Sequence, residues 1–196
     1  MKHDFGIYAR AAEFDLDNLV NQIDSSVKLR KDFLPYRDHF PKLGNAKDAI
    51  SVLDFGCGLG RNTVGIAAYS NKWQVTGYDC APMLARAREF YGKQIESERI
   101  TLEADWEKFQ GKRFDAIYAA LTLQQIKADE LLAYLADFTH MTGRLVVLSR
   151  RQTDEFKDVW GFVMRYFEMD YAPDGFSEKG KWDDHNLAVF KAKKVK

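Results

Sequence analysis

The chain has 196 residues, 46% of them hydrophobic and 30% charged, which is typical of a globular domain with one sizeable buried core. Its 29 basic residues are balanced by 29 acidic residues, so no overall charge favours nucleic acid or a membrane surface. No apolar run approaches the roughly 18 residues of a membrane-spanning helix, and the polar N-terminus does not resemble a signal peptide. We therefore expect a cytoplasmic protein whose two cysteines, Cys57 and Cys80, remain reduced.

Residues 1–49 precede the first predicted strand, and we expect helices there. Apolar residues recur at helical spacing: Leu16, Leu19, Val20, Ile23 and Val27. Two interpretations remain open: the helices pack over an edge of a sheet, or they form a lid over a ligand with Tyr8 and His39 among its side chains. We expect one domain over residues 1–196, with this lid or cap in residues 1–49 and the core in residues 50–196.

Residues 50–63, ISVLDFGCGLGRNT, predict a short buried strand, a glycine-rich turn and a helix that begins at Arg61. Gly56, Gly58 and Gly60 permit the positive φ angles of a tight turn and let a ligand approach the backbone closely. The N-terminus of the following helix offers unpaired N–H groups and a partial positive charge to a carboxylate or phosphate. This stretch therefore predicts a ligand-binding loop.

Asp54 and Arg61 bear on which ligand this loop takes. A dinucleotide loop has the pattern G-x-G-x-x-G, and counted from Gly56 the third glycine position is held by Arg61. The Asp54 carboxylate at the floor of the turn would repel a pyrophosphate and attract an ammonium or sulfonium group. The run V-L-D-F-G-C-G-L-G resembles motif I of the class I S-adenosylmethionine (AdoMet)-dependent methyltransferases. This resemblance implies that the aspartate and the three glycines of the loop bind the cofactor.

Residues 73–78 predict a second strand that ends at Asp79, 19 residues beyond Gly60. An acidic residue at about this spacing meets a ribose in Rossmann-like folds. The resemblance implies that Asp79 binds the ribose hydroxyls and that Met83 or Pro82 packs on the adenine. A helix N-cap is the alternative role for Asp79.

A third strand is predicted over residues 99–103, followed by Asp105 and Trp106. These two residues resemble the adenine-edge motif of the family, in which the aspartate accepts a hydrogen bond from the exocyclic amine. Trp106 would add an apolar wall. A plain capping role for Asp105 remains open, because the motif is short.

The fourth predicted strand, residues 114–120, ends in small residues, and Ala119 leaves room for the methionine end of the cofactor with a backbone carbonyl for its ammonium. Gln125 follows at a position where the family often has a histidine. A glutamine can orient a substrate by hydrogen bonds but cannot take up a proton at neutral pH. This departure puts histidine-assisted catalysis from that position in doubt.

The alternation of strands and helices predicts an α/β fold with a doubly wound, mostly parallel sheet. The resemblance implies seven strands with helices on both faces and an antiparallel edge strand. A further helix is expected to carry an apolar stripe over residues 156–167, followed by a loop over residues 171–182. Residues 185–192 are expected to form a strand that pairs antiparallel near the sheet edge.

We therefore expect an AdoMet-dependent methyltransferase that acts on a small-molecule acceptor by in-line displacement and leaves S-adenosylhomocysteine as the product. Weak candidates for catalysis are Tyr8, Gln125 and His185, and no cluster of side chains has metal-ligand spacing. A protein or RNA methyltransferase and a catalytically silent AdoMet-binding module that acts through partners are the alternatives. The sequence leaves open the acceptor, the methylated atom and the oligomeric state.

Overall fold

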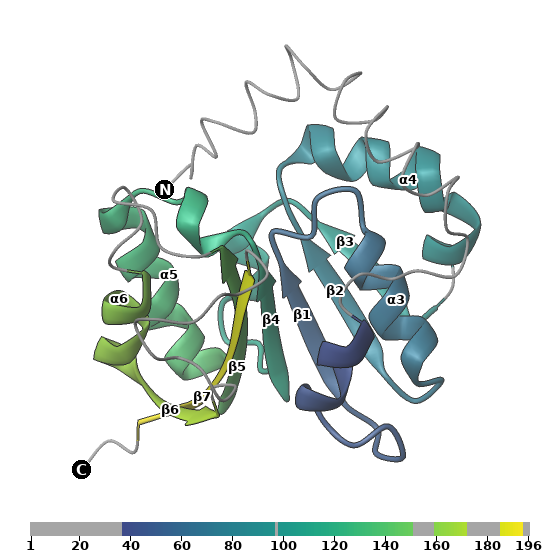
Figure 1. The fold of residues 1–196 in the computed structure, drawn as a ribbon. Coiled ribbons are helices and arrows are strands. Elements are labelled where there is room, and N and C mark those ends of the chain that lie inside the picture. The colour runs from purple at the N-terminus through teal and green to yellow at the C-terminus, as the bar shows by residue number, and fades with distance from the viewer. Residues whose placement is uncertain (1–36, 97, 151–158, 172–184, 194–196) are drawn as a thin grey trace.

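The computed structural model describes residues 37–96, 98–150, 159–171 and 185–193, which form a seven-stranded sheet in the order β3-β2-β1-β4-β5-β7-β6 (Figure 1). The strands are β1 (Ser51–Phe55), β2 (Gln74–Tyr78), β3 (Ile100–Glu103), β4 (Ala116–Ala120), β5 (Arg144–Arg150), β6 (Phe167–Tyr171) and β7 (His185–Ala192). β1 to β5 pair in parallel, whereas β7 pairs antiparallel with both β5 and β6. The predicted doubly wound sheet with an antiparallel strand near its edge is therefore confirmed.

Helices cover both faces of this sheet (Figure 1). The α-helices are α3 (Arg61–Tyr69), α4 (Ala81–Ile95), α5 (Ala128–Met141) and α6 (Val159–Tyr166), and the 3₁₀ turns are η1 (Arg37–Lys42), η2 (Trp106–Phe109) and η3 (Leu123–Gln125). Alternation along the strands produces a core on each face. In β1, Leu53 packs in the cluster that includes residues of α5 and α6, whereas its neighbour Val52 packs with residues of α3 and η1.

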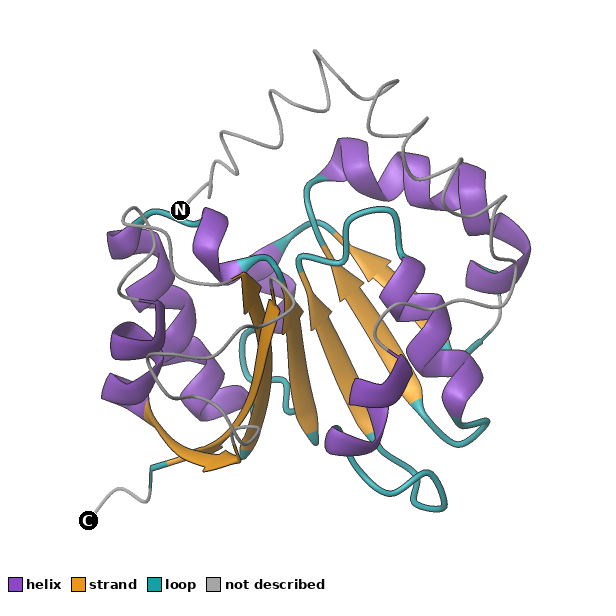
Figure 2. Cartoon of the chain, in the orientation of Figure 1, coloured by secondary structure: helices purple, strands orange, loops and turns teal. Residues whose placement is uncertain are grey.

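The order of the strands places a ligand-binding edge between β1 and β4. From β1 the chain winds outward through α3 to β2 and through α4 to β3, then returns to pair β4 with the other side of β1. The direction of winding therefore reverses between β1 and β4, and the loops at their carboxyl ends diverge there (Figure 2). Open α/β sheets bind their ligands at such a switch point.

The end of α6 differs from the sequence prediction. The helical stripe was expected to include Phe167, but α6 ends at Tyr166 and Phe167 begins the unpredicted strand β6. The reason is a non-local pairing, because Phe167 lies opposite Ala192 of β7 and is fully buried there.

The proposed lid lies largely outside the described residues, since residues 1–36 are not described. Phe40 of η1, which is described, packs in the core beside α3. Within the described part of the chain, no helix combines the length and apolarity needed to cross a membrane.

We predict that the α5 side of the core is a main source of stability. Phe138 of α5 is fully buried among Phe55 and Trp106, so Phe138→Ala should lower the free energy of unfolding by about 3–5 kcal/mol. Phe90 of α4 is 37% exposed, and Phe90→Ala is the matched control with a loss below about 1 kcal/mol. Urea denaturation measures both values, and equal losses would contradict the packing described here.

Candidate functional site

The loop after β1 is the centre of the candidate site. Gly56, Gly58 and Gly60 have φ angles of 72°, 56° and 81°, in the left-handed region that strains other residues. The N–H groups of Gly56 and Cys57 donate to the carbonyl of Tyr78 at the end of β2, over 2.8 and 3.0 Å. These bonds hold the loop, residues 56–60, against the neighbouring strand.

Asp79 fixes the loop from the side of β2. Its Oδ2 accepts from the N–H of Gly58 and its Oδ1 from the N–H of Cys80, each over 2.7 Å. Asp79 is not the N-cap of α4, because that position is taken by Cys80. The capping alternative is therefore wrong, while the expected ribose contact of this carboxylate remains a prediction.

Asp54 lies beneath the loop near the end of β1 and is 1% exposed. Its Oδ2 accepts from the hydroxyl of Thr63 on α3 over 2.6 Å. Burial raises the pKa of Asp54 to about 7; the Thr63 hydrogen bond opposes this shift and the charge of Asp79 adds to it. Burial also raises the pKa of Asp79.

These two buried carboxylates lie without a basic counterpart in the part of the chain that the structure describes. Among the described residues, no lysine or arginine forms an ion pair with Asp54 or Asp79. Burying a charge is costly unless a partner of opposite sign compensates for it. The region beneath the loop therefore suits a ligand that brings a positive charge.

Met83 lies beside the glycine loop. The methyl group of Met83 is 3.7 Å from the place that a Cβ on Gly58 would occupy, and its side chain is buried. Among the described residues, a β-carbon added at Gly58 would thus meet only this side chain. The expected contact of Met83 with adenine remains a prediction.

The segment after β3 contains the next two predicted residues. Asp105 is exposed, and its Oδ1 accepts from the N–H of Glu107, so it caps η2 as the simpler interpretation expected. Trp106 is buried, packs against Tyr78, and donates from Nε1 to Asp137 over 2.8 Å. A role for either residue at an adenine edge remains a prediction.

At the end of β4 the chain turns sharply toward the loop. Ala119 is fully buried, and Leu121 adopts a left-handed φ of 60°, which is unusual for a residue with a Cβ. Thr122 follows, and its hydroxyl donates to the carbonyls of Gly56 and Ala120, each over 3.2 Å. Thr122 could not be predicted from the sequence, because no local pattern reveals a partner 66 positions away.

Of the three weak catalytic candidates, Gln125 alone has a side chain that the structure describes. Gln125 is half-buried in η3. His185 begins β7 opposite Arg150, but its side chain, like all of Tyr8, lies outside what the structure describes. No group of three metal-ligating side chains occurs in the described part of the chain.

Part of the chain resembles a known protein family. Residues 52–143, from β1 to just beyond α5, match the family model of a methyltransferase domain. Residues 52–143 are therefore similar to methyltransferase domains, over slightly less than half of the chain. No functionally curated protein matches the chain.

Solved structures of methyltransferases share the fold of this chain. An O-methyltransferase family protein from Burkholderia thailandensis superposes with a TM-score of 0.68 at 15% identity, over 96% of this chain and 63% of its own length. The N-methyltransferase NodS from Bradyrhizobium japonicum WM9, in complex with S-adenosylhomocysteine, superposes with a TM-score of 0.62 at 19% identity. This match covers 82% of this chain and 89% of NodS. An O-methyltransferase family 2 protein from Planctomyces limnophilus, in complex with apigenin, superposes with a TM-score of 0.62 at 15% identity. This match covers 80% of this chain and 55% of that protein. This chain therefore spans less than two thirds of the first of these relatives.

We predict that ionisation of Asp54 weakens the fold as the pH rises from about 4 to about 7. Because its pKa rises from 3.8 to about 7 on folding, the folded protein keeps a proton that the unfolded chain loses, and stability falls as the pH rises through this window. In Asp54→Asn no proton is lost, and the amide oxygen still accepts from Thr63. Between pH 4 and pH 8 this variant should gain roughly 2–4 kcal/mol in free energy of unfolding relative to wild type, measured by urea denaturation.

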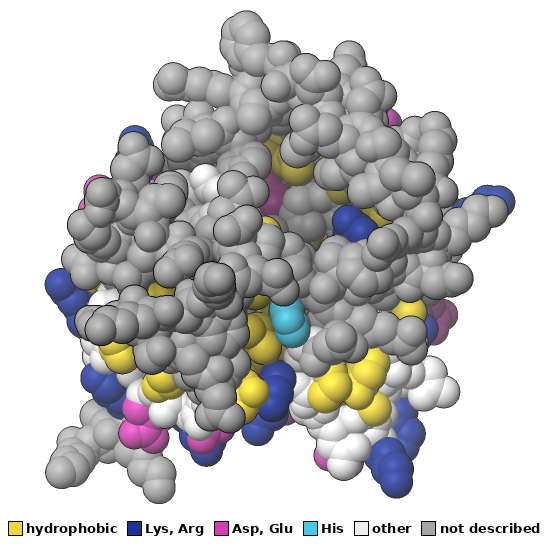
Figure 3. Space-filling model, in the orientation of Figure 1, with side chains coloured by type: hydrophobic (Ala, Val, Ile, Leu, Met, Phe, Trp, Pro, Cys, Tyr) yellow, Lys and Arg dark blue, Asp and Glu magenta, His cyan; other side chains and the backbone are white. Residues whose placement is uncertain are grey.

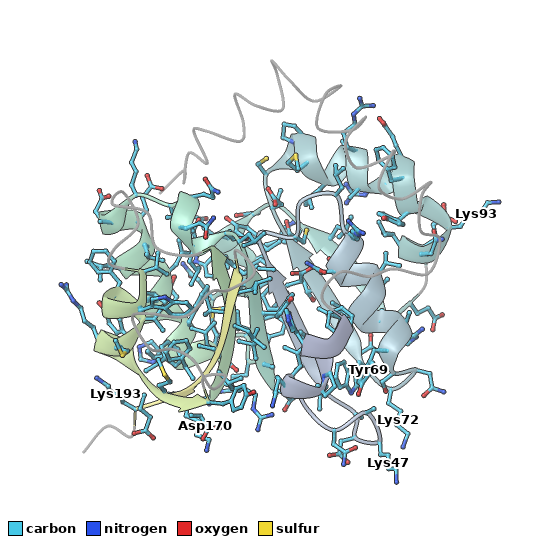
Figure 4. All side chains as sticks on the ribbon, viewed as in Figure 1. Lys47, Tyr69, Lys72, Lys93, Asp170 and Lys193 are labelled. Atoms are coloured by element: carbon cyan, nitrogen blue, oxygen red, sulfur yellow. The ribbon has the colours of Figure 1, made fainter. Side chains whose placement is uncertain are left out.

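The matched control for this prediction is Asp170→Asn, which changes an exposed carboxylate on β6, far from the glycine loop (Figure 4). Asp170 pairs with Lys191 at the surface, where an ion pair contributes about 0–1 kcal/mol. Its pH profile should follow that of wild type over the same range. Parallel profiles for Asp54→Asn and wild type would show that Asp54 titrates normally in the folded protein.

Proposed function

We propose that the chain is a methyltransferase that uses AdoMet to methylate a small-molecule acceptor. The observation that carries this proposal is a pair of buried carboxylates, Asp54 and Asp79, around a loop of left-handed glycines, with no ion pair to a lysine or arginine among the described residues. AdoMet brings a sulfonium and an ammonium group, and its ribose offers hydroxyls to a carboxylate. The complexes of NodS with S-adenosylhomocysteine and of the Planctomyces protein with apigenin support the same kind of cofactor and acceptor.

The bound cofactor would supply an electrophilic methyl group on a sulfonium, so the protein's task is alignment rather than activation. The glycine loop gives close access to the backbone, Asp79 offers a carboxylate to the ribose, and Ala119 keeps the end of β4 free of bulk. Holding the reacting groups in line lowers the barrier because the entropy of alignment is lost on binding. The chain's residues would thus contribute by binding and orienting.

On the acceptor side we propose that η3 orients the substrate without deprotonating it. Gln124 is buried and Gln125 is half-buried, and an amide donates and accepts hydrogen bonds but does not titrate near neutral pH. Tyr8 and His185 remain candidates for a base. We also propose that residues 1–196 form a single domain that works in the cytoplasm.

The described side chains on the face shown in Figure 3 favour a small acceptor over RNA. On the described surface visible in Figure 3, basic and acidic side chains are interspersed and neither sign forms a broad patch. RNA-binding surfaces usually gather positive charge along a face or groove.

A silent AdoMet-binding module is the second candidate function. The observation that favours it is Gln125, which stands where the family often has a histidine.

We predict that AdoMet and S-adenosylhomocysteine bind this chain and that NAD does not, as measured by isothermal titration calorimetry. Asp79→Ala should weaken both affinities at least about tenfold, since a hydrogen bond to a charged group contributes about 1.5–3 kcal/mol. Asp170→Ala is the matched control and should bind as wild type does. Binding of NAD alone, or of none of the three, would refute the proposed cofactor.

A second experiment tests the acceptor class. Methyl-labelled AdoMet is incubated with the protein and with separate pools of metabolites, peptides and RNA, and we expect label in the metabolite pool alone. Asp79→Ala should reduce this incorporation in parallel with its loss of affinity. Label in peptide or RNA would correct the acceptor class, and cofactor binding with no label in any pool would favour the silent module.

A further inference from the structure

Thr122 joins two parts of the site that the sequence separates. It stands just after β4 and precedes η3, yet its hydroxyl reaches the carbonyl of Gly56 in the glycine loop over 3.2 Å. The usual role of a threonine in this position is to cap its own turn, but Thr122 makes no such cap bond. Its side chain is therefore engaged across the site rather than within η3.

Packing reinforces this contact. A Cβ on Gly56 would lie 2.1 Å from Cγ2 and 2.2 Å from Oγ1 of Thr122, so the threonine occupies the space that the glycine leaves free. The Thr122 side chain therefore fits against the main chain of Gly56, and neither residue can shift far without displacing the other. The hydroxyl also has a second acceptor, the carbonyl of Ala120, at 3.2 Å. One hydroxyl proton thus serves carbonyls from the ends of both β1 and β4.

The backbone supports the same arrangement. Leu121 adopts a left-handed φ of 60°, while its N–H still donates to the carbonyl of Leu148 on β5 over 2.7 Å. The chain thus keeps its place in the sheet and turns abruptly at the next residue. A strained residue of this kind persists only where its surroundings hold it, and such residues cluster at functional sites.

We infer that Thr122 is a positioning residue that couples the glycine loop to residues 121–126, so that ordering the loop around a cofactor also orders the segment that faces the acceptor. This inference rests on the proposed function. The coupling follows from the hydroxyl bond to Gly56 and from the interlocked side chain. It would make the acceptor side better formed once the cofactor is in place.

Hydrogen–deuterium exchange on the full chain, with and without saturating S-adenosylhomocysteine, tests the coupling. In wild type the ligand should slow exchange at residues 56–60 and also at residues 121–126. Thr122→Val keeps the shape but removes the donor, so protection should persist at residues 56–60 and fall about fivefold at residues 121–126. Thr122→Ser keeps the hydroxyl and should restore the wild-type response.

The unliganded protein gives a second readout. Residues 121–126 of Thr122→Val should already exchange faster than those of wild type and of Thr122→Ser. Two results would overturn the inference and leave the proposed function intact. In the first, the ligand protects residues 121–126 of Thr122→Val as strongly as those of wild type. In the second, the ligand protects only residues 56–60 in wild type. Failure of the ligand to bind wild type would overturn the proposed function and the inference together. If Thr122→Val does not fold, Thr122→Ala takes its place with the same expectations.

Discussion

The carboxylate of Asp79 is the contact on which the arrangement of the site depends. It accepts hydrogen bonds from Gly58, in the loop after β1, and from Cys80, at the start of α4. Because these N–H groups belong to two different strand-to-helix turns, one buried side chain sets the position of both relative to the end of β2. Main-chain bonds to the carbonyl of Tyr78 hold the same junction, so the left-handed turn is fixed from beneath and from the side.

This arrangement is maintained at a cost in stability. Burial raises the pKa of both Asp54 and Asp79, which means that the fold disfavours the charges it encloses. Leu121 adds backbone strain of roughly 1–3 kcal/mol. All three residues lie at or near the carboxyl ends of β1, β2 and β4, whereas the two cores beneath are built from well-packed apolar side chains. Strain and perturbed pKa values concentrated at one edge are typical of a binding site.

The regular parts of the fold could be predicted from the sequence because their signals are local. Helix α3 and strand β7 have the predicted bounds, since glycines and changes of hydrophobic period mark them. Strand β6 could not be predicted, because Phe167 also suits the helical stripe and only its pairing with β7 settles the matter. The same limit applies to the site: Gly56 and Asp79 lie in recognisable patterns, but the partner of Thr122 is set by tertiary structure.

The charge beneath the loop links the fold to the chemistry of its ligand. A cation bound near Asp54 stabilises the ionised carboxylate and so lowers its pKa from about 7. Protonation of Asp54 and binding of the cation then oppose each other, and the cation is held more tightly as the pH rises through neutrality. Under the proposed function, the carboxylate whose ionisation weakens the fold would therefore also strengthen the binding of a sulfonium or ammonium group. Binding of a positively charged ligand would then restore part of the stability that the buried charge removes.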